Sequence, residues 1–290
     1  MSEYKKGLLY GLLCYTIWGL FPLYWRLLEH VDSFEILAHR MLWSGVFMVT
    51  LFIGVRHMRL KKNIKGGRQY LMLLLTGTLI TFNWGLYIWA INHGYILQSS
   101  LGYYINPLVN VLLGYLFLHE KLNPAQTVAL LLALAGVLYF TIDYGHFPII
   151  SLCLAFSFGI YGLLKKKIGL NATPALTVET IFMMPAAIIY MALAFHSGDS
   201  ALNTFAPVTW ILLILAGAVT AIPLLLYCKA AERITLTALG FLQYVSPTGQ
   251  FLIGILVYKE SFTTAHIVCF SLIWTGLIIF SVDTIRHLRH

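Results

Sequence analysis

Two trios of polar residues occur at helical spacing inside long apolar stretches, 101–120 and 241–260. They are Tyr103, Asn106 and Asn110 in the first stretch, and Gln243, Ser246 and Gln250 in the second. Positions three and four apart share one face of a helix, so each trio forms a polar stripe. Such groups can bind an organic solute by hydrogen bonds or can join neighbouring helices. We favour lining of a central cavity and keep interhelical bonding open.

One proline interrupts each stretch, and one glutamate ends it. Pro107 and Pro247 each remove a helical hydrogen bond, which predicts a kink or hinge where a cavity satisfies the freed carbonyl. The two stripes are therefore expected to face each other across one cavity. Glu120 and Glu260 stand just before new helix N-termini, where a carboxylate is favourable. We interpret them as helix-end capping or hinge residues, ahead of substrate ligands.

A third face combines aromatic and amide groups. Asn83, Trp84 and Tyr87 share one helix face, and Tyr227 repeats Tyr87 later in the chain. This combination suits an organic solute with both apolar and hydrogen-bonding parts, although ordinary aromatic packing remains an alternative. Four other tryptophans lie nearer segment ends and are read as anchors at the membrane interface: Trp25, Trp43, Trp89 and Trp210.

Ionisable residues inside apolar segments are functional candidates, because a charge in a membrane is costly and usually faces a cavity or a partner. His39, Arg40 and Glu179 are such residues. His39 and Glu179 could contact substrate or exchange protons. Arg40 could equally be a structural cation paired with a carboxylate or with carbonyls, and Glu35 could be solvated near the outer interface.

Searches for catalytic and metal sites find no match. The chain lacks GxSxG, GxxxxGK[ST] and paired-carboxylate motifs, and its histidines do not have zinc-protease spacing. The four cysteines form no CxxC pair. We therefore expect no catalytic residues, no metal site and no cofactor.

The composition indicates a membrane protein. Of 290 residues, 59% are hydrophobic and 10% are charged, whereas soluble domains carry about 25% charged residues. The net charge of +8 lies in the gaps between apolar runs, so it sets orientation in a bilayer and does not indicate a nucleic-acid partner.

Ten apolar segments are long enough for helices that cross a bilayer, which needs about 20 residues each. They span approximately residues 7–25, 34–54, 70–91, 96–118, 125–142, 147–164, 174–195, 207–228, 236–258 and 265–283. With the N-terminus inside, sixteen of the nineteen lysines and arginines fall in inside segments, among them 165–167. This bias predicts a multi-pass protein of the cell membrane with both termini in the cytoplasm.

The chain repeats itself without gaps at an offset of 140 residues. Pro107 then pairs with Pro247, and Tyr87 with Tyr227. The offset predicts one membrane domain made of two repeats, residues 1–143 and 144–290. Because each repeat has five helices, the second enters the membrane from the opposite side. Inverted repeats are typical of secondary transporters.

The segments 18–28, 35–44, 83–94 and 101–122 (WGLFPLYWRLL, EILAHRMLWS, NWGLYIWAINHG and LGYYINPLVNVLLGYLFLHEKL) resemble the RarD proteins of the EamA group, in the drug/metabolite transporter superfamily. The resemblance spans essentially the whole chain. It implies a cavity lined mainly by segments 7–25, 70–91, 96–118, 147–164, 207–228 and 236–258. It implies a peripheral place for 125–142 and 265–283, and it supplies no substrate.

The repeat and the resemblance predict a secondary-active transporter of small organic metabolites or drug-like solutes that works by alternating access. Its energy would come from a proton or solute gradient, with Glu179 or His39 as candidates for proton coupling. A membrane-embedded enzyme or lipid-handling protein is the alternative, and a regulatory or scaffold protein is a third. The expected partners are a small organic solute and the lipid bilayer, and a homodimer is left open.

Overall fold

The computed structural model describes residues 2–54, 64, 66–93, 95–198, 200, 203, 207–257 and 263–289. Within these residues every regular element is a helix. The helices are α1 Glu3–Gly19, α2 Phe21–Trp25, the 3-10 helix η1 Arg26–Leu28, α3 Ser33–Gly54, α5 Gly67–Asn92, α6 Ile96–Leu118, α7 Pro124–Tyr144, α8 Ile149–Ile168, α9 Ala172–Ser197, α10 Pro207–Ala231, α11 Leu236–Gln243, α12 Val245–Leu256 and α13 Thr264–Arg289. The chain therefore has the all-α membrane fold that its apolar segments predict.

Nine helices among the described residues are long and apolar enough to cross a membrane. The predicted segment 236–258 is not one continuous helix, because it consists of α11 and α12, which meet at Tyr244. Pro247 lies in the first turn of α12, where a missing N–H is tolerated. Pro107, in contrast, lies inside the continuous helix α6. Pro247 thus follows a break between two helices, whereas Pro107 lies in the middle of one.

The first predicted segment, 7–25, is also divided, since α1 ends at Gly19 and α2 begins at Phe21. This division lies against α12. A Cβ atom placed on Gly19 would lie 3.3 Å from the carbonyl oxygen of Ser246 and 3.4 Å from the Cα atom of Gly249. Glycine at both positions lets the two backbones approach this closely.

Local signals fix the ends of α7. Asn123 accepts a hydrogen bond from the backbone of Gln126, whose side chain in turn accepts from the backbone of Asn123. Pro124 occupies the first turn, and Gly145 ends the helix with φ at 75°. This capping box and left-handed glycine satisfy backbone groups that a helix leaves unpaired at its ends.

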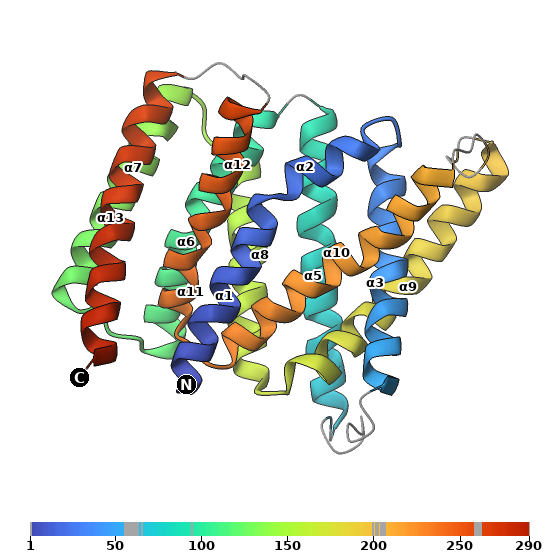
Figure 1. Cartoon of the computed structure of the whole chain (residues 1–290), viewed down its shortest axis with the longest axis horizontal. Helices are drawn as coiled ribbons and strands as arrows, with labels where there is room; N and C mark the ends of the chain where they lie inside the picture. The colour runs from blue at the N-terminus through green and yellow to red at the C-terminus, as the bar shows by residue number, and fades with distance from the viewer. Residues whose placement is uncertain are drawn as a thin grey trace.

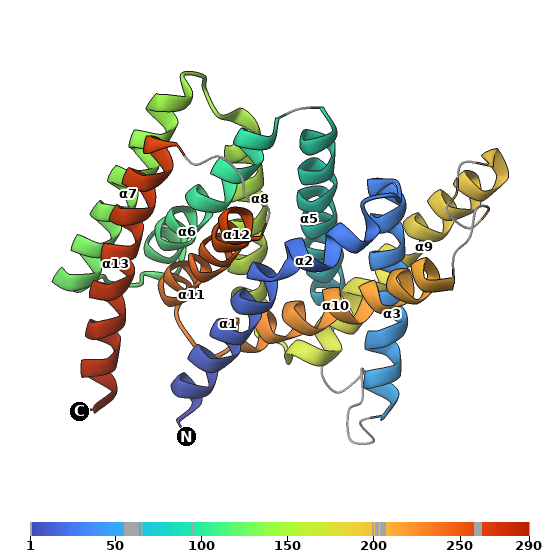
Figure 2. The ribbon, with the colours of Figure 1, turned by 45° about the horizontal axis from the view of Figure 1, so that its top comes forward.

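Within the described residues, the nine long helices and the pair α11–α12 make ten crossings, and both termini accordingly lie at the same end of the molecule (Figure 1). We call this the terminal end and the other the opposite end. Helices α7 and α13 pack side by side at one edge of the bundle in both views (Figures 1 and 2). Their place is peripheral, as the resemblance implies.

The packing of the helices follows the inverted repeat. Helix α1 packs on α10, and the corresponding helices of the other repeat, α8 and α5, pack on each other. Glycines at the helix contacts show the same relation. A Cβ atom on Gly77 would lie 3.5 Å from Met183, and one on Gly217 would meet the backbone of Trp43. Both the glycines and their neighbours are 140 residues apart.

Candidate solute-binding site

A cavity of about 340 Å³ lies between α1–α2, α3, α5, α6, α8 and α11–α12. Trp25, Ser33 and Ser99 line it close to helix ends at the opposite end of the molecule, so the cavity reaches that end. The lining residues are Trp18, Phe21, Pro22, Trp25, Ser33, Ile36, Arg40, Asn83, Trp84, Tyr87, Ile88, Ser99, Gly102, Tyr103, Asn106, Leu154, Phe158, Gln243, Ser246, Pro247 and Gln250.

Two helices differ from the lining that the resemblance implies. Helix α3 contributes Ser33, Ile36 and Arg40 to the cavity, whereas no described residue of α10 is among the lining residues. The physical reason is the position of the cavity. It occupies the half of the bundle where α3 begins, while Tyr227 on α10 lies in the closed half.

Arg40 is the described cation of the lining. Its Nε atom donates a hydrogen bond to Oγ1 of Thr220 at 3.0 Å. Its guanidinium carbon lies 4.7 Å from the ring centre of Trp25 and 4.6 Å from that of Trp84. Both distances are within the range of cation–π attraction. Trp25, expected at the membrane interface, therefore belongs to the cavity.

The amide groups of the lining are anchored on the backbone. Nδ2 of Asn83 donates to the carbonyl oxygen of Leu154 at 2.8 Å and to Oγ of Ser157 at 2.9 Å. Nδ2 of Asn106 donates to the carbonyl oxygen of Ala155 at 2.9 Å. These bonds hold α5 and α6 against α8 and orient both amides. The two side chains thus serve helix packing and cavity lining together.

Tyr87 and Tyr103 add hydroxyl groups to the same wall. Their rings meet edge to face, with ring centres 5.5 Å apart, which is a favourable aromatic arrangement. On α12, Nε2 of Gln250 donates to the carbonyl oxygen of Trp18 at 3.2 Å and to Oγ of Ser246 at 3.4 Å. Two residues of the α6 stripe and all three of the α11–α12 stripe therefore line one cavity.

The last residue of the α6 stripe, Asn110, has a different role. Asn110 is fully buried, and its Nδ2 atom donates to Oε1 of Gln243 at 2.9 Å and to Oδ1 of Asn106 at 3.2 Å. Neither Asn110 nor Pro107 is among the lining residues. The carbonyl oxygen of Pro107 instead lies 2.8 Å from where Gly240 would carry a Cβ atom. These two positions join α6 to α11.

Two candidate ionisable residues also lie away from the cavity. His39 is fully buried, and its Nδ1 atom accepts a hydrogen bond from Trp43 at 3.1 Å. Glu179 is fully buried and forms an ion pair with Lys165 at 2.9 Å. Its Oε1 atom also accepts from Thr76. Residues 165–167, counted between two predicted segments, belong to α8, which continues to Ile168, and Lys165 is buried.

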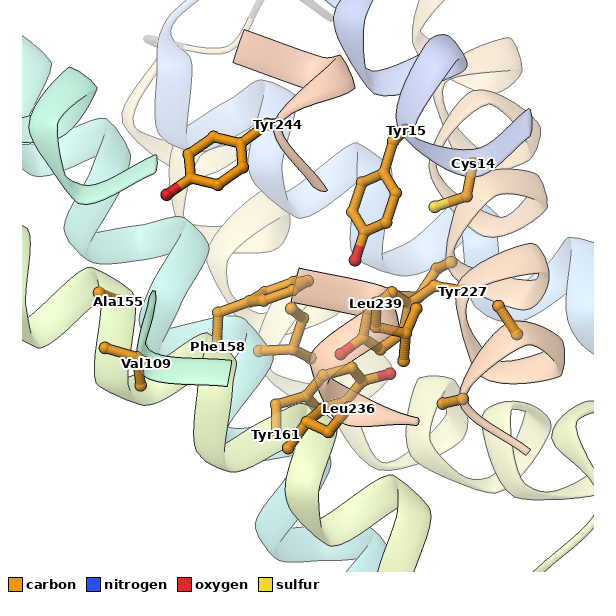
Figure 3. Close-up of a cluster of buried hydrophobic side chains, with 14 of the residues drawn as sticks. Cys14, Tyr15, Val109, Ala155, Phe158, Tyr161, Tyr227, Leu236, Leu239 and Tyr244 are labelled. Atoms are coloured by element: carbon orange, nitrogen blue, oxygen red, sulfur yellow. The ribbon is translucent and has the colours of Figure 1, made fainter. Parts of the chain in front are cut away.

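Tyr227, the remaining aromatic residue among the predicted site residues, lies where the bundle is closed toward the terminal end. Tyr227 lies in a cluster with Tyr15, Phe158 and Tyr161 (Figure 3), which we call the aromatic seal. The rings of Tyr161 and Tyr227 are stacked with centres 5.8 Å apart. The three tyrosines are 0% exposed. Tyr15 and Tyr161 lie nearer to the terminal end of their helices than the cavity residues Trp18 and Phe158 do, and Tyr227 lies in the last turns of α10 at that end. The seal therefore closes the cavity toward the terminal end.

Several lining residues were not singled out from the sequence. Trp18, Phe21 and Phe158 are apolar aromatics inside helices, and nothing in their spacing separates them from ordinary packing. The repeat offset offers one signal, because Trp18 and Phe158 are 140 residues apart. Their rings meet with centres 5.8 Å apart. Because these two equivalent positions contact each other, they lie on the pseudo-twofold axis that relates the repeats.

The acidic residues at helix ends have defined partners. The Glu120 carboxylate accepts from the backbone N–H groups of Leu236 at 2.7 Å and Thr237 at 2.8 Å. It therefore caps α11, whereas the helix that follows it, α7, is capped by Asn123. Glu35 is 2% exposed and accepts from Oγ of Ser200 at 2.6 Å, so it is not solvated. Glu260 lies outside the described residues.

No group of three or more metal-binding side chains occurs in the part of the chain that the structure describes. The arrangement instead offers one cation, several amides and hydroxyls, and many aromatic surfaces. These groups can hold a small organic molecule without changing it. The fold and the cavity together are those of a membrane transporter built of two inverted repeats.

The chain belongs to the EamA-like transporter family, whose model matches residues 5–142 and 147–282. It is 48% identical to the uncharacterized transporter YojE of Bacillus subtilis, over 99% of this chain and 97% of that one. It is 42% identical to Protein RarD of Escherichia coli, over 98% and 96% of the two chains.

Two more distant relatives extend this comparison. The Chloramphenicol-sensitive protein RarD of Pseudomonas aeruginosa is 30% identical over 98% of this chain and 96% of its own. A solved crystal structure superimposes with a TM-score of 0.73 at 17% identity, covering 95% of this chain and 97% of the other. That similarity shows the fold alone. Membership of the EamA-like transporter family makes the chain a transporter and not an enzyme.

Proposed function

We infer that this protein is a secondary-active transporter of small organic solutes that works by alternating access. The main support for this proposal is that one half of the helix bundle is accessible through the cavity, whereas the other half is closed by the aromatic seal. Phe21 and Tyr87 line the cavity, and their partners at the 140-residue offset, Tyr161 and Tyr227, form the aromatic seal. The same repeat positions therefore line the open cavity in one half and stack on each other in the closed half.

This arrangement supports a simple conformational cycle. If the two repeats exchange conformations, Phe21 and Tyr87 come together at the opposite end while Tyr161 and Tyr227 separate at the terminal end. The solute site then faces the other side of the membrane. Residues 1–143 and 144–290 are the two units that exchange.

The substrate site in this proposal consists of the cavity groups that can form directed contacts. These are Arg40, Asn83, Trp84, Tyr87, Tyr103, Asn106, Gln243, Ser246 and Gln250. His39, Asn110, Glu179 and Tyr227 lie outside the cavity in this conformation. Contact of these four with the solute stays a prediction for another state of the cycle.

A proton or solute gradient supplies the energy, because the chain carries no ATP-binding motif. Proton coupling through Glu179 would act in the closed half, and coupling through His39 would act beside Arg40 in the accessible half. Neither residue lines the cavity in this conformation. Uptake into proteoliposomes at different pH values tests this. Unchanged uptake and unchanged pH dependence in both Glu179→Gln and His39→Gln would rule it out.

The orientation follows from the positive charges between segments, which place both termini in the cytoplasm. Reporter proteins fused to either end test this: a fluorescent protein is expected to fold at both ends, and a periplasmic phosphatase to be inactive at both. The cavity in this conformation then faces outward. An active phosphatase at either terminus would contradict the orientation.

Counterflow in proteoliposomes tests the proposed function. Vesicles loaded with a panel of unlabelled metabolites are diluted into trace labelled solute, which accumulates transiently only if a carrier exchanges it. Recovery of the solute unmodified separates transport from chemistry. Failure of every panel member, in vesicles where the protein is folded, would count against a solute carrier.

A further inference from the structure

We propose that the cavity binds an organic monoanion, a carboxylate on a flat apolar body, and that Arg40 holds the carboxylate. This rests on the proposed function, because it names the class of solute that the same cavity carries. The site prefers the carboxylate over the neutral amide and over the amine of the same molecule.

Arg40 is held in place with donor groups to spare. A guanidinium carries five N–H donors in one plane. Thr220 uses the Nε donor, and the contacts with Trp25 and Trp84 involve ring faces and use no N–H group. Within the described ranges the Arg40 side chain makes no other hydrogen bond and no ion pair. The paired donors on its terminal nitrogens match the two oxygens of a carboxylate.

Among the residues that the structure describes, the cavity lining offers no counter-ion for this cation. Its described lining contains no aspartate or glutamate. Glu35 lies on the same helix but is 2% exposed and bonded to Ser200. A charged group inside a membrane protein is normally paired, because an isolated charge there is costly. An anionic solute supplies the missing partner, and an ammonium group would find none.

The rest of the cavity suits an apolar ring. Trp18, Phe21 and Phe158 line it together with Leu154, and its volume of about 340 Å³ is at the small end for ligand pockets. A doubly charged phosphate would call for a second cation, and Arg40 is the one described cation in the lining. The solute class is therefore a small aromatic or cyclic monocarboxylate.

Three molecules with the same ring and different end groups test this proposal: phenylpropionate, phenylpropionamide and phenylpropylamine. Each is titrated at neutral pH into the purified full-length protein in nanodiscs, with quenching of tryptophan fluorescence and calorimetry as readouts. We expect the carboxylate to bind about tenfold or more tightly than the amide. The amine is expected to bind more weakly than either.

Three variants connect this preference to Arg40. Arg40→Gln is expected to remove the difference between carboxylate and amide. Arg40→Lys is expected to keep part of it, because the charge remains while the two-pronged geometry is lost. Lys5→Gln removes one exposed positive charge at the terminal end and is expected to leave all three affinities unchanged.

Equal binding of carboxylate and amide, or no binding of the carboxylate, would overturn the proposal. So would a carboxylate preference that survives in Arg40→Gln. If that variant does not fold, the comparison of end groups in the wild type and in Arg40→Lys decides. If the protein shows no preference for the carboxylate but exchanges a neutral solute by counterflow, the proposed solute class is wrong, whereas the proposed transport function is supported.

Discussion

Lys165 and Glu179 form a charged pair out of contact with water, with side chains 5% and 0% exposed. Removing one partner leaves the other charge buried and uncompensated, whereas replacing both with apolar groups is often tolerated. The second carboxylate oxygen of Glu179 has no hydrogen-bond partner among the described residues. The pair joins α8 to α9 beside the aromatic seal.

Single substitutions of this pair are therefore expected to be more damaging than the double substitution. Lys165→Met or Glu179→Leu alone should lower stability by about 3–5 kcal/mol, and the double variant should recover much of that loss. Thermal unfolding in detergent measures all three. Lys6→Gln, which breaks the exposed pair with Glu3, is the control and should change stability by at most about 1 kcal/mol. Additive losses in the double variant would contradict the expectation.

Glu120 provides a second prediction for a single residue. Because its carboxylate caps the N-terminus of α11, Glu120→Gln is expected to destabilise the protein by about 0.5–2 kcal/mol. Glu29→Gln changes an exposed glutamate at the opposite end and serves as the matched control. The unfolding temperature in detergent is the measurement. Equal unfolding temperatures for the two variants would mean that the cap adds no stability.

Close contacts between helices depend on glycine at defined positions. A Cβ atom on Gly217 would lie 2.3 Å from the carbonyl carbon of Trp43, so α10 and α3 would have to separate to accept a side chain. Gly85 on α5 has no neighbour within 4 Å of such an atom. A side chain at position 217 would therefore clash with α3, whereas a side chain at position 85 would meet open space.

Alanine substitutions at these two positions are expected to act in opposite directions. Gly217→Ala should destabilise the protein by at least about 1–3 kcal/mol through overpacking. Gly85→Ala should be neutral or should stabilise the helix by up to about 1 kcal/mol. Yield and thermal stability in the same detergent give the comparison. A stable Gly217→Ala protein would show that α3 and α10 move apart easily.

The inverted repeat relates the two ends of the whole molecule. Residues that line the cavity correspond to residues in contact in the aromatic seal, and the ion pair of Lys165 and Glu179 corresponds to Trp25 and His39. The closed end therefore has an ionic contact that the other repeat cannot reproduce. This difference is expected to favour the conformation described here.

Chemical cross-linking of cysteine pairs tests the exchange. In a background without the native cysteines, a short bifunctional thiol reagent is expected to link Tyr161→Cys with Tyr227→Cys, and to link Phe21→Cys with Tyr87→Cys far more slowly. Adding Lys165→Met should reverse this order, because it weakens the closed end and shifts the population.

Lys6→Gln in the same backgrounds is the control and should leave both rates unchanged. If Lys165→Met slows the first reaction without raising the rate of the second, the closed end has merely loosened. That result would contradict an exchange between the repeats.

The membrane class, the helical segments, the inverted repeat and the residues of the polar stripes can all be predicted from the sequence. These features depend on the length of apolar runs and on a constant offset, which are local or additive properties. The sequence also predicts a kink at Pro247, whereas the break between α11 and α12 lies three residues earlier, at Tyr244, a position that no residue type marks.

Which of the candidate residues share a site depends on how the helices pack in three dimensions. Asn106 faces the cavity while Asn110, one turn away, bonds to α11, because the space between helices narrows between them. Lys165 pairs with Glu179, and Arg40 lies against Trp25, because helices distant in the chain pack with a particular rotation. That rotation depends on the fit of many side chains at once, which no stretch of sequence carries alone.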